Sequence, residues 1–180
     1  MKRFAKMLCL TACAFILAAV ATAQENLNFS NLPLVDTPSP VPNGYGQLNW
    51  GNNLYYVNPY GWSGAGPGFR LGPQDEDVVF VGARNCRLVG YACYATLSDS
   101  QGFQLVSAVV AAGFGPTMIT VTAYDSKGNA LGSANYFVNT QLQTLNFPSS
   151  WGTATEAVIQ VTGEPDDLVI YSLSLYTLGG

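Results

Sequence analysis

Residues 117–137 read TMITVTAYDSKGNALGSANYF, and this stretch decides the fold class. The apolar residues Ile119, Val121 and Ala123 alternate with polar or aromatic neighbours, a two-residue period typical of a β-strand with one buried face. The DSKGN segment that follows holds a glycine suited to a tight turn, and residues 131–138 return as a second arm. The pattern predicts a β-hairpin.

Other short runs rich in β-branched and aromatic residues lie between turns rich in glycine and proline. Residues 103–111 are apolar on both faces, so a short helix is the alternative to a strand there. In the last run, Tyr171, Leu173 and Leu175 are expected on one side, and residues 27–29 are expected to pair with this run. The remaining predicted strands are 78–81, 94–97, 142–147, 157–161 and 168–176.

About ten short strands separated by turn signals predict an all-β sandwich or barrel. No repeat of fixed period is visible, and the proline-rich residues 35–43 are interpreted as a loop rather than a domain boundary. The sequence therefore predicts a single β-sandwich domain over residues 24–180.

Residues 1–23 have the features of a signal peptide. Lys2, Arg3 and Lys6 form a basic start, residues 7–20 are almost continuously apolar, and Ala21-Thr22-Ala23 fits the small-residue cleavage rule. An uncleaved signal anchor is the alternative, although the apolar run is short for a membrane span. The expected location after cleavage is secreted and extracellular.

Cleavage leaves four basic residues against eleven acidic ones, a net charge of −7. Four scattered cations provide no basic patch for a phosphate backbone or for anionic lipid. Nucleic acid is therefore excluded as a partner, and so is the membrane surface.

Two cysteines, Cys86 and Cys93, follow the leader. In an oxidising compartment they are expected to form a disulfide that closes a short loop, with two free buried thiols as the alternative. Asn28-Phe29-Ser30 is a glycosylation sequon, which would be modified in a eukaryotic host if it is exposed.

The chain contains no histidine, which excludes Ser-His-Asp and Cys-His catalysis and the usual zinc sites. Paired carboxylates remain as a catalytic device. The two acidic clusters are Asp75-Glu76-Asp77 and Glu164, Asp166 and Asp167. Both are more simply interpreted as solvated loops, and a calcium loop is a further alternative. A hairpin turn explains residues 125–129 better than half of a calcium-binding loop does. No catalytic residue, metal ligand or cofactor is predicted.

Residues 44–67 crowd six large rings into a background of glycine, asparagine and proline. Such rings can lie against the C–H face of a sugar, and asparagine amides can bind hydroxyls. Leu48, Trp50 and Tyr56 are interpreted as core residues, and Trp151 as either core or an exposed ring. The candidate ligand-binding residues are Tyr45, Tyr55, Tyr60, Trp62, Asn52 and Asn53.

Several segments resemble a known module: NFSNLPL (28–34), GYGQLNWGNNLYYVNP (44–59), GFQLVSAVVAAGF (102–114), ITVTAYDSKGNAL (119–131) and VIYSLSLYTL (169–178). Together they resemble a jelly-roll domain of small secreted fungal proteins and of bacterial PEP-CTERM surface proteins. The resemblance implies a galactose-binding-like architecture, similar to carbohydrate-binding modules. No sorting tail follows Gly180, which favours the freely secreted type.

Members of this group often carry aspartates in the first and last strands, where they can meet at a calcium site. Here the corresponding residues 28–31 and 171–173 read NFSN and YSL. The oxygen donors that calcium prefers are depleted there, which argues against a structural calcium at that place.

The sequence thus predicts a secreted, non-catalytic module that binds a polysaccharide or glycan through the aromatic and asparagine-rich loop. A structural or effector-type domain that binds another protein, without sugar binding, is the first alternative. A carbohydrate-active enzyme that uses the acidic clusters is the second.

Overall fold

The computed structural model describes residues 22–51, 53–82, 93–162 and 168–178. Within these ranges the chain forms β-strands and three short 3-10 helices, and no helix has the length and hydrophobicity of a membrane span. The strands are β1 (Thr22–Leu27), β2 (Ser39–Pro40), β3 (Asn49–Trp50), β4 (Leu54–Val57), β5 (Val78–Val81), β6 (Cys93–Ala112), β7 (Thr117–Tyr124), β8 (Ala130–Val138), β9 (Gln143–Asn146), β10 (Ala154–Thr162) and β11 (Leu168–Leu178). The 3-10 helices are η1 (Tyr45–Gln47), η2 (Pro67–Phe69) and η3 (Ser149–Trp151).

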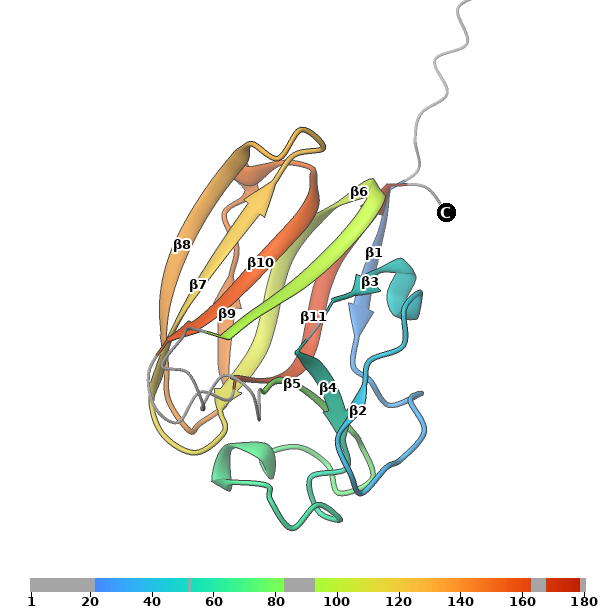
Figure 1. The fold of residues 1–180 in the computed structure, drawn as a ribbon, viewed down its shortest axis with the longest axis vertical. Coiled ribbons are helices and arrows are strands. Elements are labelled where there is room, and N and C mark those ends of the chain that lie inside the picture. The colour runs from blue at the N-terminus through green and yellow to red at the C-terminus, as the bar shows by residue number, and fades with distance from the viewer. Residues whose placement is uncertain (1–21, 52, 83–92, 163–167, 179–180) are drawn as a thin grey trace, which may run out of the picture.

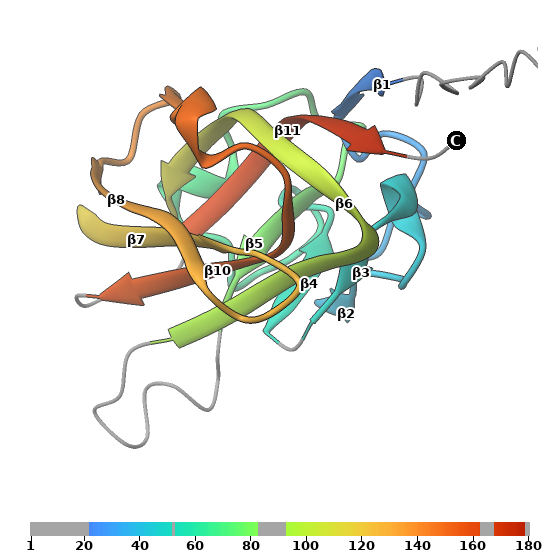
Figure 2. The ribbon, with the colours of Figure 1, turned by 90° about the horizontal axis from the view of Figure 1, so that it is seen from above.

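The strands form two antiparallel layers that pack face to face (Figures 1 and 2). In the first sheet the order is β3, β6, β10, β7 and β8. In the second sheet β9, β6 and β11 lie side by side, β1 and β5 share the far edge of β11, and β4 and β2 follow β5. The predicted all-β sandwich is confirmed.

One strand, β6, belongs to both layers. Residues 93–98 pair with β10 in the first sheet, and residues 103–112 pair with β11 in the second. Between these parts lies Gly102 with φ +96°, a conformation that a residue with a side chain rarely adopts. The bend at this point carries the chain from one layer to the other.

The predicted hairpin is confirmed as β7 and β8. Its turn is closed by Asp125, whose Oδ1 accepts hydrogen bonds from the backbone N–H groups of Lys127 and Asn129, both at 2.8 Å. The hydrogen bond from the Asn129 side chain lowers the pKa of the Asp125 carboxyl, and the backbone bonds add to this. Gly128 has φ +79°, as the turn requires.

Most other strand predictions are also confirmed, including the strand over residues 103–111, for which a short helix was the alternative. Two details differ. The N-terminal strand pairs with β11 over residues 22–27 and not 27–29, because Phe29 takes φ +63° and leaves the strand. The expectation that Tyr171 shares a side with Leu173 and Leu175 was wrong. A bulge between Ile170 and Ser172 shifts the register, so Tyr171 faces away from the core that Leu173 and Leu175 enter.

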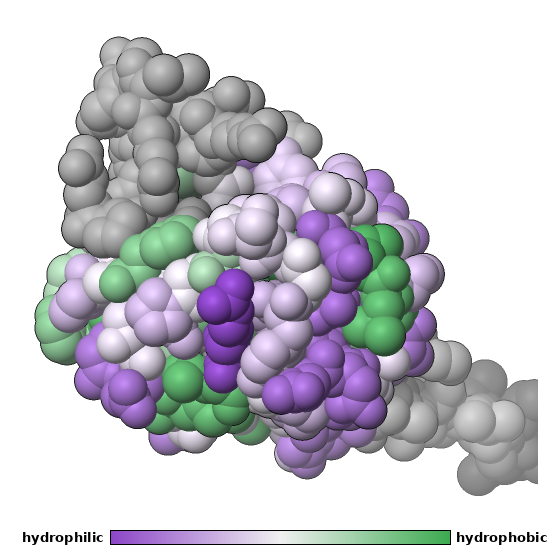
Figure 3. Space-filling view, turned by 90° about the horizontal axis from the view of Figure 1, so that it is seen from below, coloured by the Kyte–Doolittle hydropathy of each residue, from purple (hydrophilic) through white to green (hydrophobic). Residues whose placement is uncertain are grey.

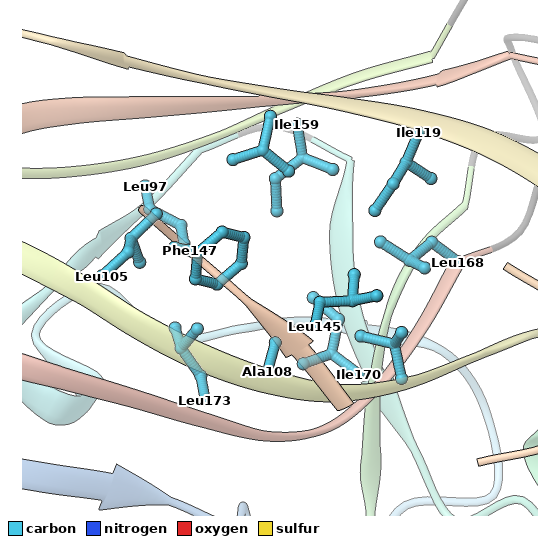
Figure 4. A pocket seen from close by; sticks show the side chains of 12 residues that line it. Leu97, Leu105, Ala108, Ile119, Leu145, Phe147, Ile159, Leu168, Ile170 and Leu173 are labelled. Carbon is cyan, nitrogen blue, oxygen red and sulfur yellow. The ribbon is translucent and has the colours of Figure 1, made fainter. Parts of the chain in front are cut away.

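The main core lies between the two sheets. At its centre is a small cavity of about 20 Å³ lined entirely by apolar side chains, among them Leu97 from the first sheet and Leu173 from the second (Figure 4). A dry cavity of this size has no polar partner for water and no room for a sugar. This cavity is therefore not a site for a saccharide.

Truncation of a core side chain tests this packing. Leu97, which is 1% exposed and lines the cavity, should lose about 2–5 kcal/mol of unfolding free energy when replaced by alanine. The matched change Leu131→Ala, on a side chain 37% exposed, should cost less than about 0.5 kcal/mol. Urea unfolding measures both, and equal losses would contradict the assignment of Leu97 to the core.

Candidate functional site

The predicted ring residues do not form one platform. Tyr45 lies in η1, where its ring stacks on Phe29 at 5.8 Å and its Oη donates to Oδ1 of Asn31 at 2.6 Å. Its carbonyl accepts a 2.8 Å hydrogen bond from Nε1 of Trp50. Tyr45 therefore packs against the main core, away from the other candidate rings.

Tyr55 and Trp62 belong to a second apolar cluster on the outer face of the second sheet. Both pack on Phe80, with ring centroids 5.9 Å and 5.5 Å away, and Trp62 also meets Phe69 edge-on at 5.3 Å. Most of the contact area of these two rings is thus used within the protein. Their role as ligand contacts remains a prediction.

The segment that follows β4 and lies over this cluster is tied down by polar contacts. The Tyr171 hydroxyl donates to the carbonyl of Gly68 at 2.6 Å and accepts from the N–H of Leu71 at 3.1 Å, and burial raises its pKa to about 12. Tyr60, 38% exposed, places its hydroxyl 2.9 Å from the carbonyl of Gly72. Tyr60 is the most exposed of the predicted rings.

Asn53 has a structural role. It takes φ +70°, and its Nδ2 donates to the carbonyl of Tyr94 on β6 at 2.9 Å. Asn52 lies outside the described residues. The predicted core residues Leu48, Trp50 and Tyr56 are confirmed as buried, and so is Trp151, which settles the choice left open by the sequence.

A surface that the sequence did not predict lies on the outer face of the first sheet. Alternation along β6, β10, β7 and β8 turns every second side chain outward, and the strand register arranges these side chains in rows. One row contains Tyr94, Gln160, Thr120 and Asn135. The neighbouring rows contain Thr96, Val158, Thr122 and Ser133 on one side, and Thr162, Met118 and Phe137 on the other.

This outer face is polar, nearly uncharged and open to solvent. Tyr94 is 51% exposed and Phe137 60% exposed. Thr120 Oγ1 donates to Asn135 Oδ1 at 2.7 Å, which uses the amide oxygen and leaves the amide N–H groups as donors. Among the paired outward positions of these strands, Glu156 is the one charged residue.

Hydrophobic residues also reach the surface at the end of the sandwich where residues 58–77 lie. Viewed from that end, they form separate patches among polar residues (Figure 3). No continuous apolar area is visible on the part of that face formed by described residues. Burying such a mixed surface would favour polar ligands over a large apolar partner.

Of the two acidic clusters, the one at residues 75–77 lies among the described residues. Glu164, Asp166 and Asp167 lie outside the described residues, so their distance from the first cluster remains untested. Asp75 is exposed, whereas Asp77 is only 2% exposed. The pKa of Asp77 is raised to about 6, mainly by burial and also by the nearby charge of Asp36, while the backbone N–H of Val35 acts in the opposite direction.

Two other predicted features lie partly outside the described residues. Cys93 is buried at the start of β6, while Cys86 is not described, so the disulfide remains a prediction. The leader residues 1–21 are likewise not described. Asn28 is exposed just beyond β1, and its Oδ1 accepts a 2.9 Å hydrogen bond from the Ser30 hydroxyl. Glycosylation there remains a prediction.

Comparison with known proteins supports the fold. No protein-family model matches the chain, and no curated protein matches it in sequence. A DUF4465 family protein from Bacteroides caccae has a similar structure, with a TM-score of 0.60 and 13% identity over 86% of this chain and 99% of that one. At this identity the similarity shows the fold alone.

Two further structures are more distant. An arabinose-bound GH51 α-L-arabinofuranosidase has a TM-score of 0.49 and 11% identity, covering 87% of this chain and 26% of that one. The module TmCBM61, in complex with β-1,4-galactotriose, has a TM-score of 0.41 and 13% identity, covering 72% of this chain and 88% of that one. Neither similarity is close enough to indicate what this chain binds.

The buried carboxyl of Asp77 predicts an unusual pH dependence. Because its pKa in the folded protein, about 6, exceeds the ordinary 3.8, the folded state holds its proton more tightly. Its contribution to stability is therefore greatest below pH 3.8 and is lost as the pH rises to about 6. In metal-free buffer, Asp77→Asn should remove this decline, measured as the difference between the two proteins in urea unfolding at each pH. Parallel profiles would contradict the burial of this carboxyl.

Proposed function

We propose that this protein is an exported, non-catalytic module that binds an uncharged polysaccharide on the outer face of the first sheet. The observation that carries the proposal is one row of that face. There the half-exposed ring of Tyr94 lies beside Gln160, followed by Thr120 and Asn135 on the next two strands.

This combination suits a sugar chain. An aromatic ring offers a flat apolar surface for the C–H face of a sugar, and amides and hydroxyls exchange hydrogen bonds with its hydroxyl groups. The near absence of charge on the face gives no reason to prefer an acidic or basic ligand. Because the side chains stand on a paired sheet, little ordering is required on binding.

The face is long enough for more than one sugar unit. Three strand spacings separate β6 from β8, which is about 14 Å. Tyr94 lies at the β6 side and Phe137 at the β8 side, with polar residues between them. An oligosaccharide that crosses the strands would meet a ring at each side and hydrogen-bonding groups in the middle.

The asparagine-rich loop contacts β6 at the edge of this sheet. The Asn53 side chain holds the carbonyl of Tyr94, and therefore the backbone from which the Tyr94 ring projects. Because Tyr60 is exposed on the surface of the second cluster, the loop predicted from the sequence is a separate place where a glycan could bind. The two places can be distinguished by mutation.

The first test is retention on insoluble polysaccharides and binding to a glycan array. If an exposed ring contributes about 1 kcal/mol of contact, Tyr94→Ala and Phe137→Ala should each weaken binding about fivefold. Asn135→Ala should also weaken it, because it removes the amide at the β8 end of the row. If the thermal stability of a variant is unchanged, its weaker binding reflects a lost contact with the glycan and not a change in the fold.

Leu34→Ala is the matched control, since Leu34 is 56% exposed and lies outside this face. Weaker binding in Tyr60→Ala, with Tyr94→Ala unaffected, would move the site to the loop. If wild-type protein is retained by no polymer, glycan binding itself is wrong.

A protein partner is the second candidate function, and one observation favours it. Met118 and Phe137 lie directly opposite each other, 42% and 60% exposed, beside the free edge of β8 in the described sheet. Exposed apolar pairs next to an edge strand can dock another chain. In this case Phe137→Lys would abolish self-association or partner capture, and polysaccharide binding would be absent.

A further inference from the structure

Asp77 is a buried acid without a side-chain partner. It directly precedes β5, is 2% exposed, and neither carboxylate oxygen has a hydrogen bond of normal geometry, although the backbone N–H of Val35 acts on the carboxylate. Among the described residues, no other buried side chain is left unsatisfied in this way. The buried hydroxyl of Thr117, for comparison, donates to the carbonyl of Thr162 at 3.0 Å. Unpaired buried carboxylates are costly, so a native structure usually supplies them with a partner.

A second carboxylate lies close to Asp77. In the β4–β5 register Val57 faces Val78, which places Asn58 and Asp77 at the same end of the strand pair. The N–H of Asn58 donates to the carbonyl of Val35 at 2.7 Å, and its Nδ2 donates to Oδ1 of Asp36 at 3.0 Å. Asp36 is therefore held at the end of the strands where Asp77 is buried.

The charges of this corner are not balanced by the described protein. The negative charge of Asp36 acts on Asp77, whose carboxylate forms no ion pair. The guanidinium of Arg70, on the same surface segment, donates instead to the backbone carbonyl of Pro59 at 3.1 Å. Two carboxylates thus lie at this corner with no cation of the described chain between them, and the Asn58 amide contacts Asp36 through its nitrogen.

We propose that Asp36 and Asp77 bind a calcium ion at this corner, with backbone carbonyls and water as further ligands. Calcium takes six to eight oxygen ligands in flexible geometry, which suits carboxylates from two separate segments completed by carbonyls and water. Magnesium demands a stricter octahedron and keeps more of its water, so it fits a buried carboxylate less well.

A proton alone would satisfy Asp77 less completely. A neutral carboxyl has an O–H group that needs an acceptor, and no acceptor for it is found among the described residues. A calcium ion uses both oxygens at once. It would also join the proline-rich segment after β1 to β4 and β5, beneath the segment that carries Tyr60 and Trp62.

The site differs from the one that the jelly-roll resemblance suggests. That one would use residues 28–31 and 171–173, whose sequence lacks carboxylates. The corner described here uses Asp36, from the loop after β1, and Asp77, from the turn before β5. It is also independent of the glycan-binding face on the other sheet.

The test uses wild-type protein freed of metal with EGTA, at a pH well above the pKa of Asp77. Addition of millimolar CaCl2, the range in which extracellular modules bind calcium, should raise the melting temperature by about 5 °C. Titration calorimetry should find one calcium ion per chain, and MgCl2 at the same concentration should have a smaller effect.

Asp77→Asn should abolish the calcium-induced shift, and Asp36→Asn should reduce or abolish it. Asp75→Asn removes the same charge two residues away on an exposed side chain and should keep the full shift. If Asp77→Asn does not fold, Asp36→Asn against Asp75→Asn decides the question.

Two results would overturn the proposal. One is a calcium shift of the same size in the Asp36 and Asp77 variants as in wild type, which would place calcium elsewhere. The other is no shift in wild type while Asp77→Asn melts at a higher temperature in EGTA, which would make Asp77 a carboxyl that is simply protonated.

Discussion

Both layers depend on one constraint: the single strand β6 pairs with β10 before its bend and with β11 after it. Each half of β6 lies inside a sheet, so the bend at Gly102 fixes how one sheet sits over the other. The apolar side chains of both inner faces then meet at one core with a cavity of only about 20 Å³. This cavity has no room for a sugar, so the candidate sites for a glycan lie on the outer surfaces.

The bulge in β11 has a second architectural effect. Before it, Leu168 and Ile170 enter the main core while Val169 and Tyr171 face outward; after it, Leu173 enters the core again. A single strand therefore contributes to two hydrophobic clusters on opposite faces of its sheet. The outer cluster anchors the long segment between β4 and β5, and this segment begins with Asn58, which holds Asp36, and ends with Asp77.

For residues 44–67, the sequence predicted the buried structural residues better than it predicted the ligand-binding residues. Leu48, Trp50 and Tyr56 were assigned to the core correctly, because apolar residues in a strand pattern have few other places to go. Whether the other rings are exposed could not be decided from the local sequence in the same way. Tyr55 and Trp62 pack on Phe80, a residue that comes eighteen or more positions later and whose approach depends on the pairing of β4 with β5.

The row containing Tyr94, Gln160, Thr120 and Asn135 was missed for a related reason. Alternation along residues 119–124 did show that one face of that strand is polar, which was the available signal. It could not show which residues of β6, β10 and β8 stand beside Thr120, because cross-strand neighbours are set by register and not by local pattern.

The sequence by itself determined the strands, the hairpin turn at Asp125–Asn129 and the all-β class, because alternation and turn chemistry act over a few neighbouring residues. Only the tertiary structure decided which side of β11 holds Tyr171, which rings lie together, and that Asp36 approaches Asp77 across forty residues of chain. Those outcomes depend on a bulge, on strand register and on loop packing, which couple residues far apart in sequence.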